Sequence, residues 1–237
     1  MAYKTREGNP LILGPVRVAG GINFSVFGPE FSKICLLLFA PGKDEPVILP
    51  FDCRINRHGD IWHLMVVGDL AGYRYAYKVY SAADNDNGRL ALDPYARYLS
   101  GGEVWGQPHQ WLGGIIADGF DWHGDRPLER PLADTIIYEL HVRGFSRHKS
   151  AGVRQPGTYS GLVEKIPYLR ELGITAIELL PVFEFDENDN SHFQPESGRR
   201  LKNFWGYSPL AFFAPKSAYA GVPGEVALEF KTMVRQM

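Results

Sequence analysis

Cysteine is scarce in this chain of 237 residues, which contains only Cys35 and Cys53. Two cysteines cannot build the disulfide framework of a small secreted domain, and no cysteine–histidine spacing matches a zinc site. Long apolar runs are missing too: no stretch reaches the about 18 residues of a membrane span, and the start lacks the apolar core of a signal peptide. We therefore expect a cytoplasmic protein that does not enter a membrane.

An excess of charge of one sign is also missing. The formal net charge is −2, and lysine and arginine are scattered along the chain. Nucleic acids and anionic membrane surfaces select clustered basic residues, so we expect neither as a partner. Aromatic residues, in contrast, make up 13% of the chain and include 12 tyrosines. Their rings suit both a protein core and the flat faces of sugars.

The first hundred residues carry the pattern of short strands separated by turns. Residues 21–28, 60–68 and 72–81 alternate apolar and polar side chains, and residues 33–40 form one apolar run. Because no helical period separates these strands, they predict an antiparallel, immunoglobulin-like β-sandwich over residues 1–100.

Aromatic side chains on these strands have two interpretations. Tyr73, Tyr75 and Tyr77 share one face of their strand, and Trp62 lies on another strand. They are either a platform for a sugar or part of the sandwich core, and we favour the core. Residues 101–134 show little periodicity and are interpreted as a connector.

From residue 135 the pattern changes to strands that alternate with helices. Residues 135–146 alternate apolar side chains with Glu139, His141 and Arg143, which predicts a strand with these polar groups on one face. Residues 174–182 predict a second buried strand, in which Glu178 repeats the pattern. A third strand region is expected over 204–215.

Two helices are predicted in the same half. Leu162, Leu169 and Leu172 mark one face of a helix over 159–173, in which Pro167 starts a new turn and Gly173 forms the C-terminal cap. A second helix is predicted over 224–237, with one apolar face made of Val226, Phe230, Met233, Val234 and Met237. Strands alternating with helices indicate a parallel α/β arrangement.

Polar groups on one face of an otherwise apolar strand favour a closed barrel over an open sheet. In a (β/α) barrel one strand face meets the helices, while the other lines a lumen whose polar groups bind one another or a ligand. We therefore interpret Glu139, His141, Arg143 and Glu178 as a structural network of a barrel interior. The alternative is that Glu139 and Glu178 form a catalytic carboxylate pair, which the residues alone do not favour.

Four ordered motifs resemble a known family: LDPYAR (92–97), IIYELHVRGFS (136–146), GTYSGLVEKIPYLRELGITAIELLPV (157–182) and NFWGYSPLAFFAP (203–215). Together they are similar to bacterial glycogen debranching enzymes of isoamylase type, in glycoside hydrolase family 13 of the α-amylase superfamily. The resemblance covers essentially the whole chain. It implies a sandwich like a carbohydrate-binding module, followed over 135–237 by the first three or so strands of an incomplete, TIM-type (β/α)₈ catalytic barrel.

The resemblance implies hydrolysis of α-1,6 branch points in glycogen or starch. Residues 135–237 are fewer than half of the about 250 that such a barrel needs, and the family's three catalytic carboxylates follow later strands. No catalytic residue is therefore assigned, and we expect this N-terminal portion alone to be inactive. The alternatives are a stand-alone α-glucan-binding protein, a partner of a second chain that completes the barrel, or a branching or trehalose-releasing enzyme of the same superfamily.

Substrate contact is implied for one tyrosine. The family places the tyrosine of its Trp-Gly-Tyr motif under the glucose ring beside the scissile bond, so the resemblance assigns this role to Tyr207, with Trp205 beside it. Expected partners are glycogen and malto-oligosaccharides. Self-association is also expected, because an incomplete barrel leaves an unpaired strand edge and an apolar surface.

The loop 183–203 is acidic. Its carboxylates come from Glu184, Asp186, Glu187 and Asp189, and the family can bind calcium in this region. Their spacing matches no EF-hand. We favour a solvated acidic loop, no metal and no cofactor.

Overall fold

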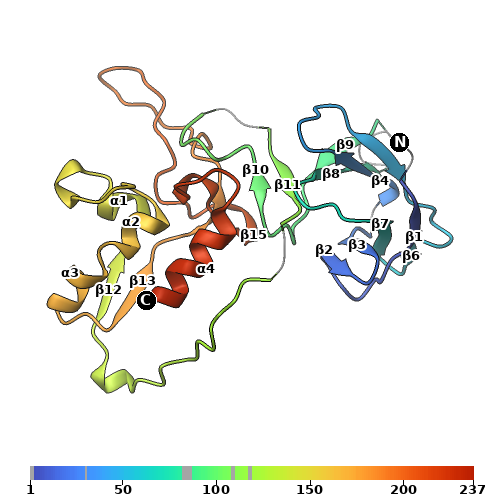
Figure 1. The fold of residues 1–237 in the computed structure, drawn as a ribbon. Helices are drawn as coiled ribbons and strands as arrows, with labels where there is room; N and C mark the ends of the chain where they lie inside the picture. Colours follow the sequence, from blue (N-terminus) through green and yellow to red (C-terminus); the bar gives the residue numbers. More distant parts are fainter. Residues whose placement is uncertain (1–2, 30, 82–86, 108–109, 117–118) are drawn as a thin grey trace. The chain divides into compact units, whose positions relative to one another are not determined.

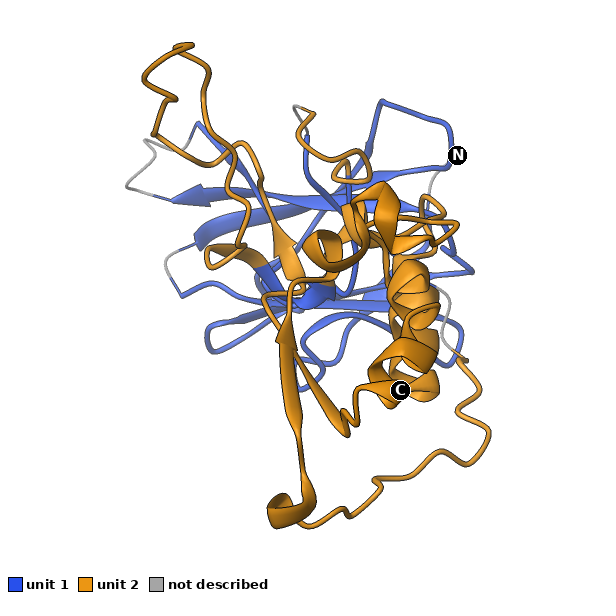
Figure 2. Ribbon diagram, turned by 90° about the vertical axis from the view of Figure 1, so that its left-hand side faces the viewer, with its two compact units in different colours: residues 1–100, 110–118, 211–214 blue, residues 101–109, 119–210, 215–237 orange. Residues whose placement is uncertain are grey.

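The computed structural model describes residues 3–29, 31–81, 87–107, 110–116 and 119–237. The chain divides into two compact units, which Figure 2 shows in separate colours. Unit 1 contains residues 1–100, 110–118 and 211–214, and unit 2 contains residues 101–109, 119–210 and 215–237. Each unit therefore includes segments that are far apart in sequence.

The first sheet of unit 1 is antiparallel and follows the predicted alternation. Its order is β1 (Thr5–Glu7), β7 (Ile61–Val67), β3 (Gly21–Phe27) and β2 (Gly14–Val18), and β6 (Arg57–His58) also pairs with β7. Phe24 on β3 faces the core, and its neighbour Asn23 points to the opposite side. Asn23 is buried as well, and its amide is satisfied because it donates to the carbonyl of Ile12 and accepts from Asn9 N.

The second sheet of unit 1 is also antiparallel. Its order is β10 (Leu99–Ser100), β11 (Leu112–Gly114), β8 (Arg74–Ser81), β4 (Phe31–Phe39) and β5 (Val47–Pro50), and β9 (Arg89–Ala91) pairs with β8. Side chains of both sheets form one buried hydrophobic cluster. This arrangement confirms the predicted antiparallel sandwich. Strand β11 comes from the segment that the sequence analysis interpreted as a connector.

Large aromatic side chains fill the sandwich core. Trp62, Tyr75 and Tyr77 are almost inaccessible to solvent, which confirms that they are core residues and not a sugar platform. The indole of Trp62 donates to the carbonyl of Gly28 over 3.1 Å. The hydroxyl of Tyr75 donates to the carboxylate of Asp93, whose pKa burial raises to about 6.

Unit 2 alternates short strands and helices (Figure 1). In chain order, the elements after residue 119 are η2 (Leu132–Asp134), β12 (Ile137–Leu140), α1 (Val142–Ser146), η3 (Lys149–Ala151), α2 (Tyr159–Val163), α3 (Ile166–Glu171), β13 (Ala176–Leu179), β14 (Phe183–Phe185), β15 (Pro209–Pro215), η4 (Ser217–Tyr219) and α4 (Val226–Gln236). Residues 211–214 of β15 belong to unit 1. Strands β12 and β13 are parallel neighbours, and β14 pairs with β15 in a second two-stranded sheet. None of the helices in the described part of the chain combines the length and apolar character needed to span a bilayer.

Proline and glycine set the helix boundaries as predicted. Pro167 lies in the first turn of α3, so the predicted helix over 159–173 is interrupted between α2 and α3. Gly173 has a φ of 77° just after α3, the left-handed conformation that ends helices. Helix α4 lies within the predicted range.

One expectation for the second half is wrong. The strand predicted over 135–146 ends at Leu140, and Val142–Ser146 are helical, so His141 and Arg143 are not on the strand face that carries Glu139. The cause is local: the side chain of His141 caps the helix by accepting from Gly144 N, and this turn competes with strand alternation. The third strand region is confirmed: β15 lies within residues 204–215, and it pairs with β14.

Candidate functional site

The site predicted to contact sugar is an exposed aromatic loop in unit 2, residues 203–208. Tyr207 has 71% of its surface exposed and Trp205 has 55%. An exposed aromatic ring offers a flat apolar face on which a ligand can stack. The structure therefore places Tyr207 and Trp205 together and accessible. Their contact with a glucan stays a prediction.

The backbone of this loop is fixed by its own residues and by packing beneath it. The amide of Asn203 donates to the carbonyl of Glu187 over 2.8 Å, and its side-chain oxygen accepts from Gly206 N over 3.1 Å. Gly206 has a φ of 77°, and a Cβ there would lie 2.6 Å from the ring of Phe185. Glycine is needed at 206 both for its conformation and for this close approach.

His141 contacts the same loop through Phe204. Its Nε2 lies 2.9 Å from the carbonyl oxygen of Phe204, and the two rings are stacked with centroids 4.3 Å apart. The edge of Trp205 approaches the same imidazole, at 6.0 Å between centroids. Burial lowers the pKa of His141, which favours the neutral ring.

A second group of aromatic rings in unit 2 contacts the cation of Arg143. Trp105 stacks on Tyr219 with centroids 6.1 Å apart, and the guanidinium of Arg143 lies 4.3 Å from the Trp105 ring centroid. Burial lowers the pKa of Arg143. Neither contact could be predicted from the sequence, because Trp105 lies in a segment without periodicity and the spacing around Arg143 is that of a strand.

Beneath these rings lies a buried charge cluster of Glu184, Glu187 and Lys216, all with 0% exposure. The ammonium of Lys216 lies 2.7 Å from Glu184 Oε1 and 2.6 Å from Glu187 Oε1, and it donates to the carbonyl of Phe185 over 3.0 Å. Burial raises the pKa of Glu184, and Lys216 offsets part of that effect. For Glu184 and Glu187 the expected solvated loop is therefore wrong, because a lysine about 30 residues away neutralises them.

The same cluster does not fit a calcium site. Calcium prefers six to eight oxygen ligands, and here an ammonium group already lies between the two buried carboxylates. Among the described residues no group of three or more histidine, cysteine, aspartate or glutamate side chains is arranged to hold a metal.

The two strand carboxylates are adjacent but separate from this cluster. Glu139 and Glu178 are register partners on β12 and β13, and both are exposed. The predicted network that joined them to His141 and Arg143 is not formed, because those two residues belong to the α1 turn.

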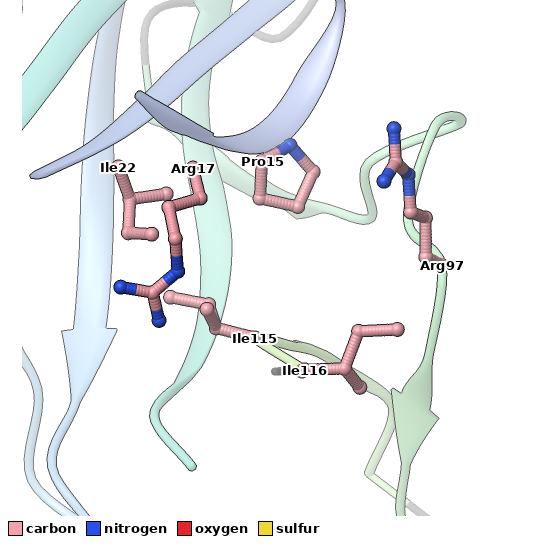
Figure 3. A pocket seen from close by; sticks show the side chains of 7 residues that line it. Pro15, Arg17, Ile22, Arg97, Ile115 and Ile116 are labelled. Atoms are coloured by element: carbon pink, nitrogen blue, oxygen red, sulfur yellow. The ribbon is translucent and has the colours of Figure 1, made fainter. Parts of the chain in front are cut away.

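Two hollows in the described part of the chain offer alternative sites. The pocket in unit 1 (Figure 3) has a volume of only about 10 Å³, enough for a single water molecule and too small for a sugar. A cleft of about 360 Å³ in unit 2 is lined by Arg154, Gln155, Ser160, Val163, Glu164, Glu229, Thr232 and Gln236, without an aromatic ring. Its central carboxylate, Glu229, already accepts from Ser160 and from the amides of Gly221 and Val222.

Comparisons with known proteins agree with this architecture. Residues 12–96 match the model of carbohydrate-binding module 48, the isoamylase N-terminal domain. The chain is 36% identical over 99% of its length to isoamylase 1, chloroplastic, of Oryza sativa subsp. japonica, and covers 32% of that protein. It is 33% identical over 97% of its length to the glycogen debranching enzyme of Klebsiella pneumoniae (strain 342), and covers 37% of it.

A solved structure shows the same likeness. Pullulanase from Paenibacillus barengoltzii, in complex with maltohexaose and alpha-cyclodextrin, matches 97% of the chain with a TM-score of 0.75 and 26% identity, and the chain covers 36% of it. Residues 12–96 thus resemble a carbohydrate-binding module of the family-48 type. The chain as a whole is similar to isoamylases and glycogen debranching enzymes, and it spans about a third of the length of the relatives that it matches.

Proposed function

We propose that this chain is the α-glucan-binding N-terminal portion of a glycoside hydrolase that cleaves α-1,6 branch points in glycogen or starch. The observation that carries the proposal is the pair of exposed rings, Trp205 and Tyr207, on a loop whose backbone is held by buried groups. A fixed aromatic ring contributes contact area at a low cost in conformational entropy. The relatives' names supply the reaction class.

In this proposal β12 and β13 are the first two strands of a (β/α)₈ barrel. Their parallel pairing, with helices between them, is the local unit from which such barrels are built. The catalytic carboxylates then belong to later strands, so residues 1–237 bind glucan without hydrolysing it. Ground-state stacking contributes binding but does not lower a chemical barrier.

A stand-alone glucan-binding protein is the second candidate, and the match of residues 12–96 to a carbohydrate-binding module favours it. The two candidates differ in what happens when a barrel is completed. Adding the remaining barrel of a related enzyme restores debranching only under the first proposal, whereas glucan binding by the sandwich alone is sufficient for the second.

The experiment uses the 237-residue chain with 5-fluorotryptophan incorporated. Maltohexaose is titrated into this chain, and ¹⁹F NMR monitors the titration. We expect the Trp205 resonance, assigned with Trp205→Phe, to shift on addition of the sugar, and Tyr207→Ala to weaken that shift. Phe193→Ala is the matched control, because Phe193 is also an exposed ring on a loop of unit 2. An unchanged Trp205 resonance at saturating sugar, or equal effects of both variants, would reject the loop as the binding site.

Two further expectations belong to this proposal. A cytoplasmic location is supported by two cysteines that are both free thiols, whereas four plant relatives are named as chloroplastic. Self-association is supported by apolar side chains exposed around β12 and α4, among them Ile137 and Leu228. Sedimentation of the chain at increasing concentration tests the second point, and a constant monomer mass would contradict it.

A further inference from the structure

His141 lies where strand β12 ends and helix α1 begins, and it joins this junction to the aromatic loop. Its side chain is buried, with 7% exposure. Three groups contact its ring atoms: the amide of Gly144, the carbonyl of Phe204 and the hydroxyl of Tyr219. These partners come from three different segments of unit 2.

The hydrogen bonds determine which ring nitrogen carries the proton. The amide of Gly144 can only donate, and it lies 3.0 Å from Nδ1, so Nδ1 must be the acceptor. The carbonyl of Phe204 can only accept, and it lies 2.9 Å from Nε2, so Nε2 must carry the hydrogen. Both requirements are met by one neutral tautomer, and the low pKa that burial gives His141 is consistent with it.

The Nε2–H group therefore fixes a peptide bond next to the exposed rings. The carbonyl of Phe204 belongs to the peptide unit that leads into Trp205, and planar peptide geometry passes this constraint to the next residue. Stacking of Phe204 on the imidazole, with an interplanar angle of 9°, holds the preceding side chain in place. Gly206 and Asn203 complete the turn before Tyr207.

We propose that His141 is the positioning residue of this loop: its Nε2–H, donated to the carbonyl of Phe204, sets the orientation of Trp205 and Tyr207. The inference rests on the proposed function, because these two rings are the proposed glucan contacts. His141 is not itself a contact, since it is buried beneath them. It acts by preorganising a binding surface, which reduces the entropy lost on binding.

Two substitutions of His141 distinguish the roles of its two ring nitrogens, because each keeps one hydrogen bond and removes the other. The amide group of asparagine lies near the position of Nδ1, so His141→Asn keeps an acceptor for Gly144 and loses the donor to Phe204. The amide group of glutamine reaches the position of Nε2, so His141→Gln keeps that donor and loses the helix cap. Tyr219→Phe is the matched control, because it removes the hydroxyl 3.2 Å from Nε2 and leaves both other hydrogen bonds.

The readout is the 5-fluorotryptophan resonance of Trp205 in the whole chain, without sugar. We expect the wild-type chemical shift in His141→Gln and in Tyr219→Phe, and a clear shift or broadening in His141→Asn. If asparagine keeps the wild-type resonance and glutamine does not, His141 acts only as a helix cap and the proposal is wrong. It is also wrong if both variants keep the resonance, or if both lose it, because then the donor hydrogen bond does not control the loop.

A second measurement needs no variant and so does not depend on variant folding. The ¹⁵N chemical shifts of the imidazole in the wild-type chain report the tautomer, and we expect the proton on Nε2. A proton on Nδ1, or a charged ring at neutral pH, would overturn the proposal. Neither of these two measurements contains glucan, so they test the role of His141 independently of the proposed function. If maltohexaose fails to shift the Trp205 resonance, the proposed function is rejected, and the role of His141 is still decided by the fluorotryptophan and ¹⁵N measurements.

Discussion

Tyr75 donates its hydroxyl hydrogen to Asp93 over 2.8 Å, inside a core where both side chains are almost inaccessible to solvent. Asp93 also accepts from the backbone amide of Tyr95. Burial raises the pKa of Asp93 to about 6, and the two hydrogen bonds oppose this without cancelling it. The sandwich therefore contains a carboxyl group that takes up a proton at a higher pH than a carboxyl group in water does.

Stability of unit 1 is expected to fall as the pH rises from about 4 to about 6. The folded state holds the Asp93 proton more tightly than the unfolded state does, so folding is favoured below the unfolded pKa of 3.8 and this advantage is lost through the folded pKa. A shift of this size corresponds to about 3 kcal/mol. Hydrogen exchange of the β8 amides across this pH range measures it.

Asp93→Asn should remove that pH dependence, because the amide stays neutral and can still accept from Tyr95 N. Asp93→Ala should lower the free energy of unfolding by about 1–3 kcal/mol at pH 4, because it leaves the buried Tyr75 hydroxyl without its partner. A pH dependence in Asp93→Asn equal to that of the wild type would assign the effect to another group.

Lys216→Met should destabilise unit 2 by about 3–5 kcal/mol at neutral pH, because two buried carboxylates would lose their shared cation. Lys149→Met is the control, since Lys149 is exposed and should change stability little. Chemical unfolding followed by the fluorotryptophan resonance of Trp105 reports on unit 2. Equal effects of the two substitutions would mean that the cluster contributes nothing specific.

Gly206→Ala should disorder the aromatic loop. Both Gly206 and Gly198 have positive φ, which costs alanine about 1–2 kcal/mol. Only at position 206 does the added Cβ meet another group, the ring of Phe185. Gly206→Ala should therefore lower the free energy of unfolding by about 1–3 kcal/mol more than Gly198→Ala does. Hydrogen exchange of residues 203–208 should rise in Gly206→Ala and not in Gly198→Ala; similar exchange in both would show that contact with Phe185 is unimportant.

The 237-residue chain should release no reducing ends from glycogen above a mock preparation. Glu139 and Glu178 are adjacent but exposed to water, and a glycosidase acid is usually held in a site that raises its pKa. Activity that disappears with Glu139→Gln or Glu178→Gln would show that this pair is catalytic.

The features that could be predicted from the sequence are those determined by neighbouring residues along the chain. Alternation placed Tyr75 and Tyr77 in the core, because a strand has a period of two. Pro167 and Gly173 predicted helix boundaries, because their backbone preferences hardly depend on context. The exposed pair Trp205 and Tyr207 came from a family resemblance, and no periodic pattern would have singled it out.

The features that sequence missed depend on partners far along the chain or on competing local turns. Glu184 and Glu187 were expected in water because the lysine that neutralises them lies in another segment, after β15. His141 fits a strand by its spacing, and its ring caps α1 by accepting from the backbone amide of residue 144, a donor that almost any residue supplies and that leaves no signal in the sequence. Strand β11 has three residues, two of them glycine, and such a strand has almost no sequence signal.

The sandwich unit is built from three separate segments of the chain, residues 1–100, 110–118 and 211–214. In the third segment, Ala211 and Ala214 pack with Ala96 and Leu99 of the first. A piece cut after residue 100 would lose the pairing partner of β10 and half of that small cluster. Transplanting this sandwich onto another enzyme therefore requires new joins between 100 and 110 and between 118 and 211, and a single boundary would not suffice.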